Sequence, residues 1–320
     1  MHRREFIQIL SAAGVAAIPL SADTGSRPKR IEGVFPIAQS PFTDSDQLDL
    51  NTLVEELQFI DRGRVHGFVW PQLASEWSTL SESERMAGTE AVCREGKKLR
   101  PAIIIGAQAP SIPVAVRYAK HAAKCGADAV IALPPSNAED QNALLEYYSA
   151  IGKATELPLV VQAVGQMSVD SIINLSKAIP NLHYVKDEAG QPLFRLAEFR
   201  AKADGKLKIF TGSHGKTLID EMLRGFSGTM PAAPFADIYA TAWDLWHEGK
   251  RREAVEMFGN AAVLIQEVST YGTEATKYLL CLRGVFKNTR VRRPEKTKLD
   301  ETGKQVLREM LDLMKPYLRA

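Results

Sequence analysis

A lysine stands at the end of a short apolar run, where its amine could carry covalent chemistry. Lys186 directly follows Tyr184 and Val185, so a strand here would carry the ammonium group to the strand's end. Burial lowers the pKa of a lysine, and the resulting neutral amine attacks a carbonyl carbon to form a Schiff base. The alternative is a solvated lysine that pairs with Asp187 or Glu188. Position alone leaves both interpretations open.

Other residues suited to acid–base chemistry and to binding follow further apolar runs. His214 comes shortly after residues 208–211, and an imidazole titrates near neutral pH, so His214 is a candidate acid or base. Its alternative role is that of a loop histidine bonded to the backbone. Glu76 is a further carboxylate candidate, and Gln162 offers an amide to a hydroxyl or a carboxylate.

The spacing of potential metal ligands is not typical of a metal site. Cys93, Cys125 and Cys281 are too far apart for a CxxC-type site or a disulfide scaffold. Each lies in a predicted helix, where a small buried side chain is the simpler role. A Gly-x-Gly-x-x-Gly motif follows none of the apolar runs, which argues against a dinucleotide site. We therefore expect a reaction without a metal or an organic cofactor.

The composition of the 320 residues is that of a soluble globular protein. Its 40 basic and 38 acidic side chains are spread along the chain and give a net charge of +2, which argues against a nucleic-acid partner. Apolar residues make up 45% and charged residues 24%, which excludes disordered, collagen-like and coiled-coil chains. We expect a small molecule as the partner, and neither nucleic acid nor, in the mature form, a membrane.

The elements that must position these residues alternate regularly along the chain. Short apolar runs, each followed by a turn and an amphipathic stretch, lie at 33–38, 67–70, 102–106, 129–133, 159–164, 183–185, 208–211 and 228–232. Several are apolar at nearly every position, as in parallel strands that helices cover on both faces. The alternation predicts the α/β class and a closed (β/α)8 TIM barrel over residues 31–234, rather than an open doubly wound sheet.

Helical patterns lie between the runs and continue after the last of them. Ser81 is a predicted helix cap, with Glu84 three residues on. After Pro234 the alternation ends, and the remaining patterns predict a C-terminal helical extension over residues 235–320. In a barrel of this kind the active site forms at the C-terminal ends of the strands, which is where Lys186 is expected.

Three short motifs lie at or near the predicted second, sixth and eighth strands. They are Ser75-Glu76-x-x-Thr79-Leu80, Val185-Lys186-Asp187-Glu188-Ala189-Gly190 and Gly225-x-x-Gly228. In order and spacing they resemble the dihydrodipicolinate synthase/N-acetylneuraminate lyase family, over nearly all of the chain after Gly33. The resemblance implies a class I aldolase or lyase whose sixth-strand lysine forms a Schiff base with pyruvate or another 2-oxo acid. Lys186 falls on that lysine, and a homo-oligomer, either dimer or tetramer, is also implied.

The sequence departs from that family where the family binds substrate and moves protons. The family's second-strand motif Gly-Thr-Thr-Gly-Glu, whose threonines hold the substrate carboxylate, corresponds here to residues 72–76. Ser75 or the loop's backbone N–H groups would then replace those hydroxyls. The family's fourth-strand tyrosine relays protons, and Ser136 takes its place, although a serine is a poor unaided acid or base near neutral pH.

The resemblance and its departures together define a candidate site and leave three functions open. Lys186, Ser136 and His214 are the predicted catalytic residues. The predicted substrate-binding residues are Ala74, Ser75, Glu76, Gln162 and Met230. The leading hypothesis is a Schiff-base lyase or aldolase acting on a 2-oxo acid. The alternatives are a sugar-acid dehydratase that uses the same imine, and a 2-oxo acid or sugar-acid binding protein without turnover.

The first 22 residues have the features of an export signal. Arg3 and Arg4, followed by an acidic residue, Phe and Ile, resemble a twin-arginine signal. The apolar run over residues 9–20 is short for a transmembrane helix, and Ser21-Ala22 offers a small-residue cleavage site. We expect residues 1–22 to be a signal peptide and 23–30 a linker. The protein is then periplasmic or otherwise exported, and cytoplasmic if the signal does not function.

Overall fold

The computed structural model describes residues 29–203, 205–293 and 297–320. The predicted signal peptide, and the predicted linker up to residue 28, lie outside the described residues. Within the described part, no helix is both long enough and apolar enough to span a membrane.

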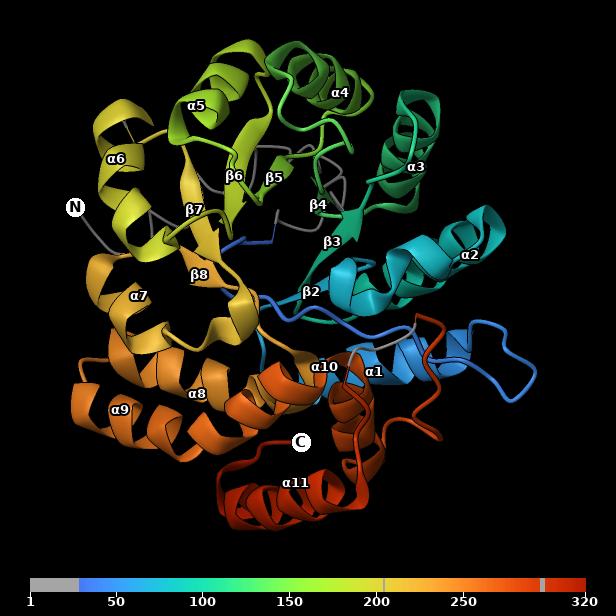
Figure 1. Cartoon of the computed structure of the whole chain (residues 1–320), viewed down its shortest axis with the longest axis vertical. Coiled ribbons are helices and arrows are strands. Elements are labelled where there is room, and N and C mark those ends of the chain that lie inside the picture. The colour runs from blue at the N-terminus through green and yellow to red at the C-terminus, as the bar shows by residue number, and fades with distance from the viewer. Residues whose placement is uncertain (1–28, 204, 294–296) are drawn as a thin grey trace, which may run out of the picture.

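Eight parallel strands pair in the order β1-β8-β7-β6-β5-β4-β3-β2. They are β1 (Gly33–Val34), β2 (Gly67–Trp70), β3 (Ala102–Gly106), β4 (Ala129–Ala132), β5 (Leu159–Ala163), β6 (Leu182–Asp187), β7 (Lys208–Thr211) and β8 (Gly228–Thr229). Beyond β1 the chain meets β2, where the N–H of Ala38 donates to the carbonyl of Val69 at 3.0 Å. The predicted (β/α)8 barrel is confirmed (Figure 1).

A ring of helices surrounds the strands. It consists of α1 (Leu50–Arg62), α2 (Glu82–Gly96), α3 (Ile112–Cys125), α4 (Gln141–Lys153), α5 (Val169–Ala178), α6 (Pro192–Ala203), α7 (Leu218–Arg224) and α8 (Ala236–His247). The predicted cap of α2 is present, because the Ser81 hydroxyl accepts from the N–H of Glu84 while the Glu84 carboxylate accepts from the N–H of Ser81. Helix α8 lies in the segment predicted as the extension, and it packs against β1 and α7 as the eighth helix of the ring.

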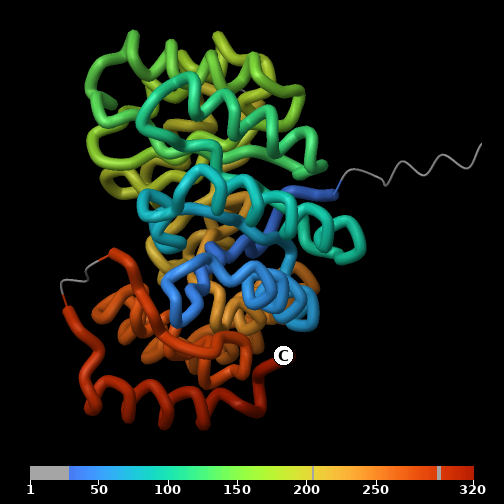
Figure 2. The backbone as a smooth tube through the Cα atoms, turned by 90° about the vertical axis from the view of Figure 1, so that its right-hand side faces the viewer, coloured from blue at the N-terminus to red at the C-terminus, as the bar shows by residue number. Residues whose placement is uncertain are grey.

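Three further helices complete the chain: α9 (Arg251–Asn260), α10 (Ala262–Leu282) and α11 (Glu301–Met314). They gather on one side of the barrel, in orange and red in Figure 2. Helix α10 is kinked at Gly272, whose φ of 65° lies in the left-handed region that favours glycine. Helix α10 contacts the 3₁₀ turns Leu73–Ser75 and Ser213–Gly215, so the C-terminal helices reach the loops that follow β2 and β7.

Two apolar layers hold the barrel together. Side chains of the strands, together with Phe35 just after β1, fill its interior, including Val69, Ile104, Val160 and Phe210. A larger layer lies between the strands and the helices and continues under α8 and α10. The interior is therefore a packed core, and a ligand site is expected at the end of the barrel.

Glu56 is a fully buried carboxyl group of α1. Both of its oxygens lie 3.1 Å from the N–H of Gln39, which donates to them. Burial raises the pKa of Glu56 from 4.5 to about 8, against the opposing effects of this hydrogen bond and of Lys277. The folded protein therefore keeps a proton that the unfolded chain releases near pH 4.5. This contribution to stability is present below that pH and declines as the pH rises to about 8.

We expect Glu56→Gln to remove this pH dependence, because the amide has no proton to lose. The free energy of unfolding of the variant, relative to the wild type, should increase by about 1.4 kcal/mol for each pH unit between about pH 5 and about pH 8. Urea denaturation at several pH values measures this difference. Glu55→Gln, on the exposed face of the same helix, is the matched control. A difference that stays constant over this range would contradict a protonated Glu56.

Candidate active site

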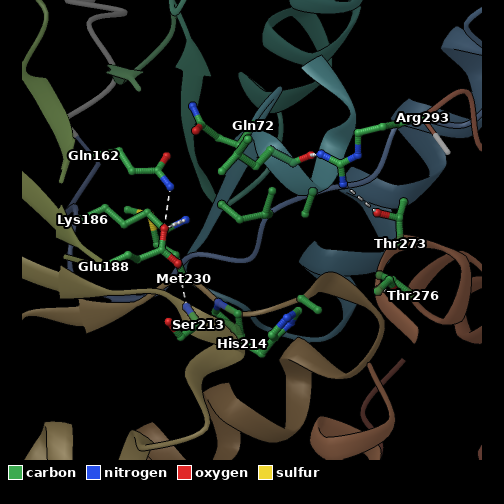
Figure 3. A pocket seen from close by; sticks show the side chains of 16 residues that line it. Gln72, Gln162, Lys186, Glu188, Ser213, His214, Met230, Thr273, Thr276 and Arg293 are labelled. Atoms are coloured by element: carbon green, nitrogen blue, oxygen red, sulfur yellow. Dashed lines mark hydrogen bonds and ion pairs between the residues drawn. The ribbon is translucent and has the colours of Figure 1, made fainter. Parts of the chain in front are cut away.

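A cavity of about 250 Å³ opens at the C-terminal ends of the strands (Figure 3). Its walls come from the loops after β2, β7 and β8, from the ends of β5 and β6, and from α10 and the segment that follows it. The polar and charged side chains in its lining are Gln72, Gln162, Lys186, Glu188, Ser213, His214, Thr273, Thr276 and Arg293. The position agrees with the expectation for a parallel barrel.

Lys186 projects into this cavity from β6 and is 5% exposed. Its neighbour Val185 points the opposite way, into the layer beneath the helices, because successive residues of a strand alternate between faces. The Lys186 Nζ lies 2.9 Å from Glu188 Oε2. The lysine is thus buried rather than solvated, and it forms the pair with Glu188 that the alternative interpretation also names.

Glu188 is the centre of a small polar network beside the lysine. It accepts hydrogen bonds from Gln162 Nε2 at 2.5 Å and from the N–H of Ser213 at 2.7 Å. Burial alone would raise the pKa of Glu188, but the Lys186 charge and these hydrogen bonds outweigh it and hold the pKa below its usual value. Glu188 is therefore a carboxylate at neutral pH, placed to accept a proton from the lysine.

Asp187, the other acidic neighbour of Lys186, belongs to a different environment. Its carboxylate is fully buried and accepts from Arg195 Nε at 2.9 Å. Burial raises its pKa, and the arginine opposes this rise. Because Asp187 is not among the lining residues, Glu188 is the acidic partner of the cavity.

His214 lines the cavity from the loop after β7. Its backbone has a φ of 61°, and its carbonyl accepts a hydrogen bond from Tyr239 Oη at 2.6 Å. Burial lowers the pKa of His214, Lys216 and Lys186 lower it further, and Glu188 acts in the opposite direction. The imidazole is therefore neutral at pH 7 and able to accept a proton.

The structure brings together five of the residues predicted from the sequence and separates three others from them. Ala74, Gln162, Lys186, His214 and Met230 line the same cavity. Ser136 is exposed and lines a separate cavity of about 1020 Å³ between the loops after β4 and β5. The Ser75 hydroxyl is buried, donates to the Ala38 carbonyl at 2.5 Å and accepts from the N–H of Gln72 at 3.0 Å, so it holds the loop after β2 in shape.

Glu76 joins that loop to the C-terminal part of the chain. Its carboxylate accepts from Lys277 Nζ at 2.6 Å, and both side chains are fully buried. It also accepts from the backbone N–H groups of Arg292 and Arg293, each at 2.7 Å. The observed role of Glu76 is thus to anchor the segment after α10 against the loop after β2.

Several residues of the cavity were not predicted. Thr273, Thr276 and Arg293 come from α10 and the segment after it, far along the chain from every strand. Gln162, which was predicted, and Gln72 are both buried, and the Oε1 atom of each accepts no hydrogen bond within the described part of the chain. These two oxygens suit hydroxyl groups of a ligand. Among residues 29–203, 205–293 and 297–320, no group of three or more His, Cys, Asp or Glu is arranged to hold a metal ion.

Comparison with known proteins places the chain in a family. The model of the dihydrodipicolinate synthetase family matches residues 30–313. The 4-hydroxy-tetrahydrodipicolinate synthase of Rhizobium meliloti is 31% identical over 175 residues, which are 53% of this chain and 59% of that protein. The chain thus spans about three-fifths of that curated relative's length.

Solved structures show the same fold over a longer part of the chain. The 4-hydroxy-tetrahydrodipicolinate synthase of Methylacidiphilum fumariolicum has a TM-score of 0.80 at 23% identity, covering 90% of this chain and 97% of its own. The Escherichia coli protein YagE, solved in complex with pyruvate, has a TM-score of 0.79 at 19% identity and covers 89% and 99%. With the family match extending from the residue before the barrel into α11, the chain belongs to the dihydrodipicolinate synthetase family.

Proposed function

We propose that the protein is a Schiff-base lyase or aldolase that acts on pyruvate or another 2-oxo acid, with Lys186 as the nucleophile. The observation that carries this proposal is the buried Lys186 amine, which lies in a cavity 2.9 Å from the Glu188 carboxylate. The family membership adds support, since relatives are named as synthases and lyases and one was solved in complex with pyruvate.

The residues of the cavity supply the proton transfers that this chemistry needs. Glu188 takes a proton from the Lys186 ammonium, and the free amine attacks the ketone carbon of the substrate. Loss of water from the adduct leaves an iminium ion, which withdraws electrons from the neighbouring carbon. His214, neutral at pH 7, then removes a proton from that carbon. Alternatively, the next carbon–carbon bond breaks, and its electron pair forms the enamine.

Borohydride trapping tests the imine directly. Purified mature protein is mixed with pyruvate or a small panel of 2-oxo acids and reduced, and peptide mass spectrometry locates the adduct. We expect a reduced adduct on Lys186 and none on Lys216, an exposed lysine after β7 that serves as the internal control. A folded protein that gives no adduct with any acid would refute the lyase proposal and favour a binding protein without turnover.

Product analysis separates the remaining alternatives once an adduct is found. Retro-aldol cleavage yields two carbonyl compounds, whereas a sugar-acid dehydratase releases water and keeps the carbon chain intact. An adduct without any product identifies a binding protein that retains the lysine. For the proposed lyase we expect cleavage or addition products, detected by mass spectrometry of the reaction mixture.

We also propose that the protein is exported through the twin-arginine route. Support comes from Arg3 and Arg4 and from the short apolar run that follows them. Replacing both arginines with lysine should retain the protein in the cytoplasm, because the export receptor reads the arginine pair. Fractionation of cells that express the wild type and the variant measures this, and normal export of the variant would refute the assignment.

The protein is further proposed to be a homo-oligomer, as the family resemblance implies. Phe194 and Leu223, each 64% exposed on the neighbouring helices α6 and α7, offer apolar surface for such an association. Light scattering coupled to gel filtration measures the mass, and a monomer at micromolar concentration would contradict the proposal.

A further inference from the structure

The cavity between the loops after β4 and β5, the second cavity, adjoins the cavity that contains Lys186. Its volume is about 1020 Å³, whereas that of the first is about 250 Å³. Leu73 lines both cavities, and the end of β5 places Gln162 in the wall of the first and the nearby Val164 in the wall of the second. The two cavities are therefore neighbours at the C-terminal end of the barrel, and Leu73 forms a boundary between them.

The side chain of Leu73 is a boundary that can move. The backbone of this residue is held in the 3₁₀ turn after β2, because its carbonyl accepts from the N–H of Glu76 at 3.1 Å. Its side chain, in contrast, is 44% exposed. Exposed side chains change rotamer within nanoseconds. A group that extends from Lys186 could therefore pass Leu73 and enter the second cavity.

Apolar side chains from three loops meet in the wall of the second cavity. Leu133 and Met167 are buried there, and Trp77, Pro134 and Val164 are half-buried beside them. Apolar surface of this kind binds an apolar group because both are removed from water. The Trp77 ring also suits an aromatic group, since aromatic rings attract one another when they stack or meet edge to face.

The charges of the second cavity disfavour an anionic group. Among its described lining residues, the charged side chains are Glu139 and Asp140, and both are acidic. Asp140 also caps α4, because its carboxylate accepts from the N–H of Asn142 at 2.8 Å. A carboxylate bound here would lie near two other carboxylates, with no basic side chain in the described lining to offset the repulsion. An uncharged group avoids this cost.

We propose that the second cavity binds the far end of the substrate, and that this end is an uncharged apolar group, preferably an aromatic one. The inference rests on the proposed function, since it assumes that the ketone carbon is bonded to Lys186. The first cavity then holds the 2-oxo acid group, and the loops after β2, β4 and β5 select the tail. Ser136 becomes a residue of the tail-binding wall instead of a proton relay.

Four acids that differ only in the tail test the proposal. 2-Oxo-4-phenylbutanoate and 2-oxo-6-phenylhexanoate carry a phenyl group on a short and on a longer chain. 6-(4-Carboxyphenyl)-2-oxohexanoate adds a carboxylate to the longer tail, and pyruvate has no tail. Each acid is titrated by calorimetry, which detects binding with or without an imine, and is also trapped with borohydride.

Variants of the wall show where the tail binds. Ser136→Trp and Val164→Trp fill the second cavity from two different loops, and Glu139→Lys reverses a charge in its wall. Ser269→Trp, at an exposed position of α10 outside both cavities, is the matched control. Circular dichroism verifies that each variant is folded.

We expect the wild type and Ser269→Trp to bind one or both phenyl acids at least about tenfold more tightly than pyruvate. The carboxyphenyl acid should bind more weakly than its uncharged counterpart, and Glu139→Lys should reduce this difference. Ser136→Trp and Val164→Trp should each lose most of the preference for a phenyl tail.

Three results would overturn the inference. They are phenyl acids that bind the wild type no more tightly than pyruvate, a preference that both folded tryptophan variants retain, and a carboxyphenyl acid that binds as tightly as the uncharged one. If pyruvate still forms an adduct on Lys186 in such a case, the proposed function stands without the tail site. A preference seen by calorimetry without any adduct would support the tail site while refuting the Schiff-base function.

Discussion

Replacing Lys186 with methionine is expected to abolish imine formation and to lower kcat by at least about a thousandfold, whichever 2-oxo acid is the substrate. Methionine fills a similar volume and has no amine, so the change removes the nucleophile and leaves the barrel core in place. Steady-state kinetics measures the loss, and borohydride trapping with mass spectrometry confirms the absence of the adduct. A variant that keeps a tenth of the wild-type kcat would exclude Lys186 as the nucleophile.

Two controls separate the lost amine from secondary effects. Lys186→Met leaves the largely buried Glu188 carboxylate without its ion-pair partner, which carries a cost of its own. The double variant Lys186→Met/Glu188→Gln removes that charge, and we expect it to be equally inactive but more stable than the single variant. Lys177→Met, on the exposed face of α5, should retain wild-type activity.

The second large effect is expected on stability, from Glu76→Gln. Glu76 and Lys277 form a fully buried ion pair at 2.6 Å, and Glu76 also accepts from two backbone N–H groups of the C-terminal segment. Removing one partner leaves a buried ammonium without compensation, which costs about 3–5 kcal/mol. We expect the melting temperature to fall by about 6–10 °C in calorimetry.

Matched substitutions test whether the buried charge is the cause. Glu76→Gln/Lys277→Met removes both charges, so it should recover part of the lost stability. Arg252 and Glu256 form an exposed pair four residues apart on α9, and Arg252→Ala should change the stability by less than about 0.5 kcal/mol. If Glu76→Gln melts within a degree of the wild type, the pair is not an anchor of the fold.

The barrel and the position of Lys186 could be predicted because both follow from residues that lie close together in the sequence. Runs such as 102–106 and 159–161 are apolar throughout, as buried parallel strands require, and turns separate the strands from amphipathic helices. Lys186 ends one such run, so its place at the end of the barrel follows from the strand itself. His214 and Gln162 reach the cavity for the same reason.

The roles of other residues depend on contacts between parts of the chain that are far apart in the sequence, and the local pattern does not predict such contacts. Ser136 follows β4 as predicted, but its loop turns away to a second cavity. Glu76 follows β2, and its carboxylate meets Lys277, 201 residues away. Arg293 enters the cavity through that contact, and nothing in the sequence around it distinguishes it from Arg290 or Arg292.

Because Glu76 anchors the segment after α10, two parts of the chain that are far apart in the sequence line the cavity. Lys186, the proposed nucleophile, lies on a core strand, where most substitutions would disturb packing on both faces. The Arg293 side chain lies on a surface segment whose backbone is held by a carboxylate that accepts from main-chain N–H groups, and every residue except proline carries such a group. The side chain at position 293 can therefore change during evolution while the anchor and the lysine stay intact. Exchange of a few residues near the end of the chain can in this way alter substrate selection while the proposed covalent step stays the same.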